Sequence, residues 1–588
     1  MEENILAAEP IQQKKPLKLN YPRTIKVGFA FAIISLFWGA YDFVIPLLLE
    51  NAYGLSNTLR GVVMGLDNLL SLFLLPLFGK LSDKADGKLI RKFGKRTPFI
   101  LIGTIVAATL MIFVPVSAKA QMVKSEDVRN SYYLEISQDS ELLKEKLTYF
   151  YGNSTYCDVS YLNQNNISQE DYINIKYNHV TTSGALKKTY YYNGEKITKE
   201  EYTELKAENA NYNKYVSSGM KVWLSEQIND DVLSSSAGKS SLAGFMVILL
   251  FTLLAMATFR SPAVALMPDV TPKPLRSQGN AIINLAGGIG GAIAFIIYTV
   301  VLFRTDINNY IIIFSAVAGA MLLLLMGFIT LVKERKWTKE CEDLCLEYGI
   351  YTAEEVQADR EKIKKPPLKL RSAEEKAKFK SFILILASIF MWFMGYNAVS
   401  STMSIYCTKA LNLDAGIASI VSGVSMGVSA IAFIPVGIMA VKFGRRKSII
   451  FGFGLAIVSF LLIFFFVRQS TTPTVPAILF SLFYLIAGFG LIITNVNTFP
   501  MVVELADADE IGKYTGFYYT ATMSAQAITP TLAGLVMDYM GMKYLFAYSA
   551  VAVIIALVIM IFVKHGDSKQ IGKLTKEEKK QAIYDAAD

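Results

Sequence analysis

Three ionisable residues interrupt long apolar stretches in the first half of this 588-residue chain: Asp42, Asp67 and Arg260. A charged side chain at membrane depth is costly, so it usually faces a polar cavity, pairs with another charge, or carries ions and protons. Carboxylates accept hydrogen bonds and can bind protons, and a guanidinium donates hydrogen bonds without losing its charge. We therefore expect these three residues to serve in cation or proton coupling.

The stretches that hold these residues indicate an all-α membrane protein. Hydrophobic residues make up 53% of the chain and charged residues 18%. The apolar residues gather in runs long enough to cross a bilayer as helices. Twelve such runs are predicted, at residues 27–49, 58–81, 97–118, 240–264, 278–303, 310–332, 380–407, 416–441, 448–467, 475–502, 514–536 and 543–563.

Basic residues set the expected orientation. Lys and Arg cluster before the first run and after the second and eighth runs, which places both termini in the cytoplasm of a multi-pass cell-membrane protein. The first run is preceded by Pro, Lys and Gln and lacks a following cleavage site, so we expect it to stay in the mature protein. The formal charge of +9 then reflects topology, and no nucleic-acid partner is predicted.

The runs and the polar segments between them divide the chain into parts. These are a cytoplasmic N-terminal segment (1–26), a first bundle (helices 1–3 at 27–118 and helices 4–6 at 239–333), an extracytoplasmic insertion (119–238), a cytoplasmic linker (334–379), a second bundle (helices 7–12 at 380–563) and a cytoplasmic tail (564–588).

The insertion contains a short repeat, residues 161–176 against 191–206. In each copy a hydroxyl residue, Ser168 or Thr198, lies three residues before an acid, which predicts a helix-opening capping box. We expect a small domain of two turn–helix units. Its role stays open between a spacer or cover and a module that captures carbohydrate or a partner.

The two halves of the chain also resemble each other. PLFGKL (76–81) followed by KFGKR (92–96) is matched by PVGIM (435–439) followed by KFGRR (442–446). Two six-helix bundles related as parallel repeats are the layout of a transporter that rocks around a midplane site. In this alignment Asp42 corresponds to Asn397, Asp67 falls near Ser425 and Arg260 falls on Thr498, so the charges belong to the first bundle.

On these loop motifs the chain resembles the major facilitator superfamily. The superfamily's signature, a glycine, an acid and then a glycine with two basic residues, is present after the second run and, without the acid, after the eighth. We expect these residues and two acids near them to form an inter-bundle latch at the cytoplasmic face: Gly79, Asp83, Gly94, Lys95, Arg96, Asp269, Gly437, Gly444, Arg445, Arg446 and Asp507.

A narrower resemblance is to the glycoside-pentoside-hexuronide cation symporters, in their sucrose/proton symporter-like branch. It rests on LDNLLSLFLLPLFGKLSD (66–83), GKRTPF (94–99), RSPAVALMPD (260–269) and FPMVVELADADEIGKYTGFYYT (499–520). The resemblance implies symport of a glycoside or an oligosaccharide such as a disaccharide. Melibiose-type sodium symporters of that family carry two acids one turn apart in helix 2. Here only Asp67 is present, which puts a sodium site of that type in doubt and leaves proton and sodium coupling open.

Substrate contacts are expected on helical faces near the three charges. Asp42 follows Trp38 by four residues, so a carboxylate and an indole share one face. Asp67 is the better candidate for a protonatable site, because burial favours the neutral form of a carboxyl group. Arg260, which is expected nearer the cytoplasmic end, would in turn favour the charged form. The candidate substrate-binding residues are Trp38, Tyr41, Asn68, Asn284, Trp392, Tyr396, Asn397, Asn495 and Gln526.

Other functional classes find little support in the sequence. There is no nucleotide-binding loop, and Cys341 and Cys345 have no neighbouring His or second Cys pair. No catalytic residue, metal site or cofactor is predicted. We expect a monomer in the bilayer that carries a small molecule of the sugar class with protons or sodium. An exporter or a lipid or drug carrier of the same fold, and a membrane sensor that uses the insertion, stay as alternatives.

Overall fold

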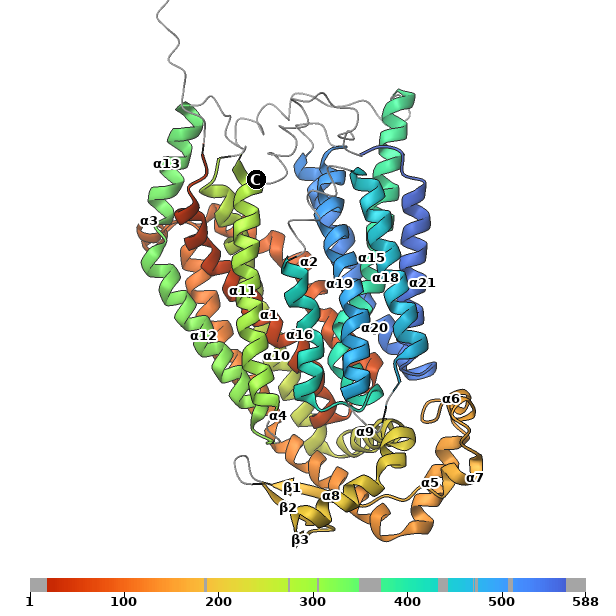
Figure 1. The fold of residues 1–588 in the computed structure, drawn as a ribbon. Coiled ribbons are helices and arrows are strands. Elements are labelled where there is room, and N and C mark those ends of the chain that lie inside the picture. Colours follow the sequence, from red (N-terminus) through yellow and green to blue (C-terminus); the bar gives the residue numbers. More distant parts are fainter. Residues whose placement is uncertain are drawn as a thin grey trace, which may run out of the picture.

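The computed structural model describes residues 18–183, 188–272, 275–303, 306–347, 372–431, 443–468, 470, 474–505 and 511–566. Long helices stand side by side in two groups, and a smaller part with short helices and strands covers one end of both (Figure 1). The first group contains α1 (Tyr21–Tyr53), α2 (Asn57–Lys84), α4 (Thr97–Gln138), α10 (Ser236–Asp269), α11 (Arg276–Leu302) and α12 (Asn309–Leu331). The second contains α15 (Ala373–Ile405), α16 (Ala415–Ile431), α18 (Arg445–Phe466), α19 (Thr474–Val503), α20 (Ile511–Tyr539) and α21 (Tyr544–Ile561).

These helices confirm the predicted all-α membrane fold. Each predicted run coincides with one of them. In the described part of the chain, ten helices are long and apolar enough to cross a membrane. The other two are α16, which is described only to Ile431, and α20, which is less apolar.

Small residues let the helices approach closely. In the first bundle, a side chain added at Gly290 of α11 would overlap the backbone of α1 at Ala32. Between the bundles, side chains at Gly61 or Gly65 of α2 would overlap the backbone of α20. In the same helix as Gly290, Gly287 packs closely against Ser35, whereas side chains added at Gly288 and Gly291 would meet open space.

Two segments that we expected to be polar connections contain helix. The third predicted run ends at residue 118, but α4 continues to Gln138. The polar extension keeps good helix formers such as Lys, Gln, Met and Glu, and it is anchored because Ser125 Oγ donates to the Ala52 carbonyl at 2.7 Å. The predicted linker likewise begins with a helix, α13 (Glu334–Glu347). A further short helix, α3 (Lys88–Phe93), lies in the loop after α2.

The insertion forms a small unit with its own hydrophobic core, in which Leu147, Phe150, Tyr172 and Val216 are buried. It follows α4 with α5 (Ser140–Tyr151), α6 (Val159–Gln164), α7 (Gln169–Ile173), β1 (Val180–Ser183), β2 (Thr189–Tyr192), β3 (Glu195–Ile197), α8 (Lys199–Glu208), the π-helix η1 (Tyr212–Val216) and α9 (Ser217–Ser234). The strands form an antiparallel sheet in the order β1-β2-β3.

The prediction of two turn–helix units in the insertion is partly wrong. Ser168 and Thr198 do cap helices: each side-chain oxygen accepts from the backbone N–H three residues later, at 3.0 and 3.2 Å. However, the second copy begins with the β2–β3 hairpin, which we did not expect. Its turn is Asn193-Gly194, and both residues have positive φ, 47° and 87°, as a tight hairpin turn requires.

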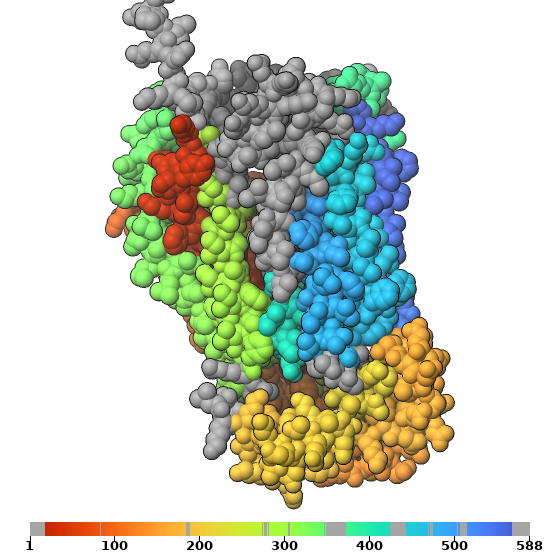
Figure 2. Space-filling view, in the orientation of Figure 1, coloured from red at the N-terminus to blue at the C-terminus, as the bar shows by residue number. Residues whose placement is uncertain are grey.

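The position of the insertion defines two ends of the molecule. The insertion lies beneath both helical groups (Figure 2), and we call this end the insertion side. The described chain ends, near α1 and α21, and helix α13 lie at the opposite end (Figure 1), which we call the terminal side.

Candidate functional site

A cavity of about 180 Å³ lies between the two bundles and contains all three charges singled out in the sequence. We call it the central cavity. Its wall from the first bundle is Trp38, Asp42, Met64, Asp67, Asn68 and Arg260, and its wall from the second is Asn397, Ser400, Ser401, Gln526 and Pro530. Four helices therefore contribute most of the wall: α1, α2, α15 and α20.

The charged wall comes from three helices of the first bundle. The Asp42 carboxylate on α1 is exposed, whereas Asp67 on α2 is only 8% exposed and accepts from Asn68 Nδ2 at 2.9 Å. The Arg260 guanidinium on α10 lies 5.4 Å from the centre of the Trp38 ring, within cation–π range. It also lies within electrostatic reach of both carboxylates.

These contacts place Arg260 differently from a simple ion pair with Asp67. No ion pair joins Arg260 to either carboxylate among the described side chains. The guanidinium instead lies over the indole of Trp38. The guanidinium can thus respond to the charge on either carboxylate without being fixed by one of them.

The neutral wall comes from the second bundle. Ser400 Oγ donates to Asn397 Oδ1 at 3.2 Å, and Asn397 Nδ2 donates to the Gln526 carbonyl at 3.4 Å. These amides and hydroxyls can donate and accept hydrogen bonds. The predicted correspondence of Asp42 with Asn397 becomes a spatial one, since the two residues face the same cavity from α1 and α15.

The remaining predicted substrate residues lie away from this wall. Tyr41 is buried against Phe37 and Trp38. Trp392 is fully buried and stacks on Tyr396 and Phe453. Asn284 and Asn495 are exposed on α11 and α19. Of the nine predicted substrate residues, Trp38, Asn68, Asn397 and Gln526 are thus brought together in the central cavity.

The residues that correspond to Asp67 and Arg260 in the second half, Ser425 and Thr498, are not among the described lining of the central cavity. Thr498 is buried, and its hydroxyl lies 3.3 Å from that of Tyr518. The side chain of Ser425 lies outside the described part of the structure.

On the insertion side, the bundles are joined by a buried ionic network that the sequence did not predict. Glu50 of α1 pairs with Arg60 of α2 and with Lys409, at 2.5 Å, in the π-helix η4 (Tyr406–Ala410) that follows α15. Lys409 Nζ also donates to Ser225 of α9 at 2.8 Å. The network therefore connects the first bundle, the second bundle and the insertion at one point.

A second set of contacts joins the two bundles on the insertion side. Both Asp538 oxygens, at the end of α20, accept hydrogen bonds at the start of α2: the Asn57 backbone N–H donates at 3.0 Å and the Thr58 N–H at 2.8 Å. A carboxylate at a helix N-terminus satisfies free N–H groups and complements the helix dipole. The two bundles are thus tied together on the insertion side.

Two of the predicted latch residues, Arg96 and Arg445, form contacts between neighbouring segments. Arg96 Nε donates to Asp269 Oδ2 at 2.8 Å, and the backbone N–H groups of Arg96 and Thr97 donate to Glu334 at 2.8 and 2.7 Å. Burial raises the pKa of Glu334, although these hydrogen bonds oppose the shift. In the second bundle Arg445 pairs with Glu504.

The Arg96–Asp269 pair joins α4 to α10, and the Glu334 contacts join α4 to α13, which follows the first bundle. The inter-bundle latch itself stays a prediction. Gly94 and Gly444 have φ values of 113° and 92° and precede α4 and α18, which explains the glycines. Gly79 lies against Ser261, and Lys95 is exposed. Gly437, Asp507 and the side chain of Asp83 lie outside the described part.

Several residues of the site were not predicted from the sequence. Met64, Ser401 and Pro530 line the cavity without any charge to draw attention. Glu50 and Arg60 stand at the ends of apolar runs, where charged residues are normally solvated. Their only sequence signal is that both flank the same short turn between the first two runs.

Comparison with protein families supports the same layout. The model of the Major Facilitator Superfamily matches residues 232–530 and 385–585 of the chain. None of the curated proteins compared with the chain matches it.

Solved transporter structures share the fold over nearly the whole chain. The inward-open xylose transporter XylE from E. coli is 14% identical, with a TM-score of 0.51, and the match covers 95% of this chain and 98% of that one. A D-xylose-proton symporter is 15% identical, with a TM-score of 0.51 and coverages of 94% and 100%. A bacterial homologue of the iron transporter ferroportin in an inward-facing state is 12% identical, with a TM-score of 0.53 and coverages of 93% and 99%.

Proposed function

Because the chain belongs to the major facilitator superfamily and is therefore a membrane transporter rather than an enzyme, we propose that it imports a glycoside or oligosaccharide together with protons. The observation that carries this proposal is the central cavity. There, two carboxylates and a guanidinium of the first bundle face amides and hydroxyls of the second.

The coupling ion is proposed from the types of residue in the cavity. Asp67 is the buried carboxylate, so it is the group whose charge is most strongly felt by its neighbours. When a proton neutralises Asp67, the electrostatic hold on Arg260 weakens, and the guanidinium becomes available to substrate hydroxyls. One proton that enters with the substrate contributes about 2.3 kcal/mol per 100 mV of membrane potential.

The substrate class is proposed from the combination of an apolar ring, Trp38, with hydrogen-bonding side chains around it. An indole offers a flat apolar face, while Asp42, Asn397 and Gln526 offer hydrogen-bonding groups around it. Sugars present both an apolar ring face and many hydroxyls. The two xylose transporters that share the fold are also sugar transporters by name.

The direction of access is proposed from the contacts between the bundles. The Glu50 network and the Asp538 contacts tie the bundles together on the insertion side. If the basic loops place the terminal side in the cytoplasm, this state is closed to the outside. Alternating access then requires these contacts to break while the terminal side closes.

Binding to the purified protein tests the substrate class. We expect one or a few disaccharides or glycosides from a panel to raise the melting temperature, and the response to disappear in Asp42→Asn. Asp86→Asn is the matched control, because Asp86 lies in an exposed surface ion pair. A protein that ignores every sugar but is stabilised by apolar drugs or lipids would favour the exporter or lipid carrier instead.

A further inference from the structure

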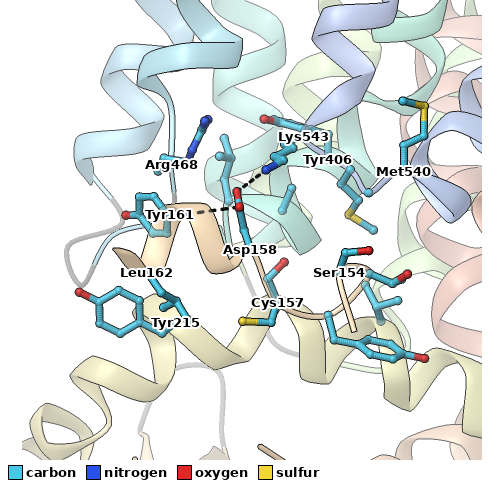
Figure 3. Close-up of a pocket in the computed structure, with 18 of the residues that line it drawn as sticks. Ser154, Cys157, Asp158, Tyr161, Leu162, Tyr215, Tyr406, Arg468, Met540 and Lys543 are labelled. Carbon is cyan, nitrogen blue, oxygen red and sulfur yellow. Dashed lines mark hydrogen bonds and ion pairs between the residues drawn. The ribbon is translucent and has the colours of Figure 1, made fainter. Parts of the chain in front are cut away.

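A second cavity, of about 140 Å³, lies between the insertion and the second bundle. We call it the interface cavity (Figure 3). The insertion contributes Asp158, Tyr161 and Lys214 to its wall, and the second bundle contributes Arg468 and Lys543. It is separate from the central cavity, and the two share no lining residue.

The charges around the interface cavity are unbalanced. Lys543 Nζ is paired with Asp158 Oδ2 at 2.6 Å, as the dashed line in Figure 3 shows. The other two cations, Lys214 and Arg468, form no ion pair with a carboxylate in the described part of the chain. Three basic side chains therefore share one acidic group.

The two unpaired cations come from opposite sides of the interface and lie near two neighbouring tyrosines, Tyr161 and Tyr215, whose ring centres are 6.3 Å apart. The Arg468 guanidinium lies 6.0 Å from the centre of the Tyr161 ring. Among the described residues its hydrogen bonds run from Nη1 to the Phe464 and Val467 carbonyls. Lys214 lies 4.8 Å from the centre of the Tyr215 ring. Both cations act electrostatically on the Tyr161 hydroxyl.

Like charges that are brought together at a partly buried interface repel each other and weaken it. An anion between them would convert this repulsion into two charge-assisted hydrogen bonds, one from the planar guanidinium and one from the ammonium. We propose that the interface cavity binds a small anion, through a phosphate or carboxylate group held by Lys214 and Arg468. The anion bridges the insertion and the second bundle.

The same bridge affects the state of the transporter. Ser225 and Asn229 of α9 bond to Glu50 and to the Tyr53 carbonyl of the first bundle, while Lys221 bonds to the Thr408 carbonyl of the second at 3.0 Å. The insertion thus spans both bundles, and a bound anion stabilises the state that is closed on the insertion side. This consequence rests on the proposed alternating access, whereas the binding itself does not.

Binding is tested on the full-length protein in neutral phosphatidylcholine nanodiscs. Inorganic phosphate is titrated calorimetrically, with chloride at matched ionic strength as the comparison. We expect saturable phosphate binding that is about tenfold or more weaker in Lys214→Gln and in Arg468→Gln. Lys196→Gln, which removes an exposed lysine of the same insertion, should bind like the unchanged protein. Arg468→Lys, which keeps the charge, should lose less than Arg468→Gln.

The source of the anion is distinguished by adding phosphatidylglycerol to the nanodiscs. If a lipid headgroup occupies the cavity, this lipid raises the melting temperature and weakens phosphate binding, and both effects are lost in Arg468→Gln. If phosphate binds equally with and without the anionic lipid, the ligand comes from solution. Either result supports an anion site, because both depend on the same two cations.

Labelling of the Cys157 thiol measures how often the interface between the insertion and the second bundle opens. Cys157 lines the interface cavity and is buried, so in a protein with Cys341, Cys345 and Cys407 changed to Ser its maleimide labelling follows opening of the interface. We expect phosphate to slow this labelling and chloride not to. The proposal is overturned if phosphate does not bind, if chloride has the same effect, or if Lys214→Gln and Arg468→Gln bind phosphate as the unchanged folded protein does. Neither phosphate binding nor Cys157 labelling depends on sugar uptake. The anion site can therefore be tested even if the proposed sugar transport is wrong.

Discussion

The Asp67 carboxylate is the residue on which coupling depends in our proposal. It is buried in α2 beside Asn68 and lies within electrostatic reach of Arg260. In Asp67→Asn the side chain keeps its shape but can no longer gain or lose a proton.

We expect Asp67→Asn to abolish accumulation of sugar against a gradient while exchange of sugar across the membrane continues. Radiolabelled uptake and counterflow in the same vesicles separate the two activities. Asp86→Asn, at an exposed ion pair, should behave like the unchanged protein. Full accumulation in Asp67→Asn would remove this carboxylate from the coupling mechanism.

Trp38 contacts the Arg260 guanidinium and lines the central cavity in which the substrate is proposed to bind. A cation–π contact contributes about 0.5–2 kcal/mol depending on its exposure. We expect Trp38→Leu to raise KM for sugar about two- to thirtyfold, with a smaller effect for Trp38→Phe, which keeps an aromatic face. An unchanged KM in Trp38→Leu, measured by initial rates, would place the sugar elsewhere.

At this scale the sequence was most informative where a residue type conflicts with its surroundings. Asp42, Asp67 and Arg260 are costly in apolar helices, so their meeting in one cavity could be anticipated. Asn284 and Trp392 illustrate the limit. Polar and aromatic residues are tolerated on several faces of a membrane helix, and the sequence does not say which face meets the cavity.

Among the elements, the ends of α1, α2 and α20 and the helix α9 hold the insertion side closed. Glu50 balances two cations, Arg60 and Lys409, in a buried place. Removing the one acid of such a group leaves buried charge without compensation, which costs roughly 3–5 kcal/mol.

Glu50→Gln should therefore lower the melting temperature and favour the state that is open on the insertion side. The first effect is measured by thermal unfolding, and the second by faster maleimide labelling of Cys157, whose pKa is raised by burial to about 11. Glu374→Gln, at an exposed pair with Lys378, is the control and should change neither. If Glu50→Gln is as stable and as slowly labelled as the control, the network does not hold the closure.

The elements also show what local patterns can and cannot predict. The apolar runs located each helix of the two bundles because membrane helices satisfy their own backbone. The β2–β3 hairpin was missed although Asn193-Gly194, between β-prone tyrosines and isoleucine, is a strong hairpin signal. The capping residues of the repeat drew attention to helices and away from the strands beside them.

For the whole molecule, the internal repeat predicted two bundles of six helices, and the family and structural comparisons support this layout. The repeat could not predict which side is closed, since a transporter sequence must be compatible with more than one state. Nor could it predict that the insertion contacts both bundles. That arrangement depends on tertiary pairs such as Lys221 with Thr408, which have no local sequence pattern.

The central claim is that proton movement drives sugar import through the cavity between the bundles. Reconstituted vesicles in which proton and sodium gradients are imposed separately test it most directly, with uptake of the best-binding sugar as the measurement. We predict that an inward proton gradient drives accumulation, that a protonophore abolishes it, and that a sodium gradient alone has no effect. Accumulation driven by sodium alone, or sugar uptake that never exceeds equilibrium under a proton gradient, would contradict the claim.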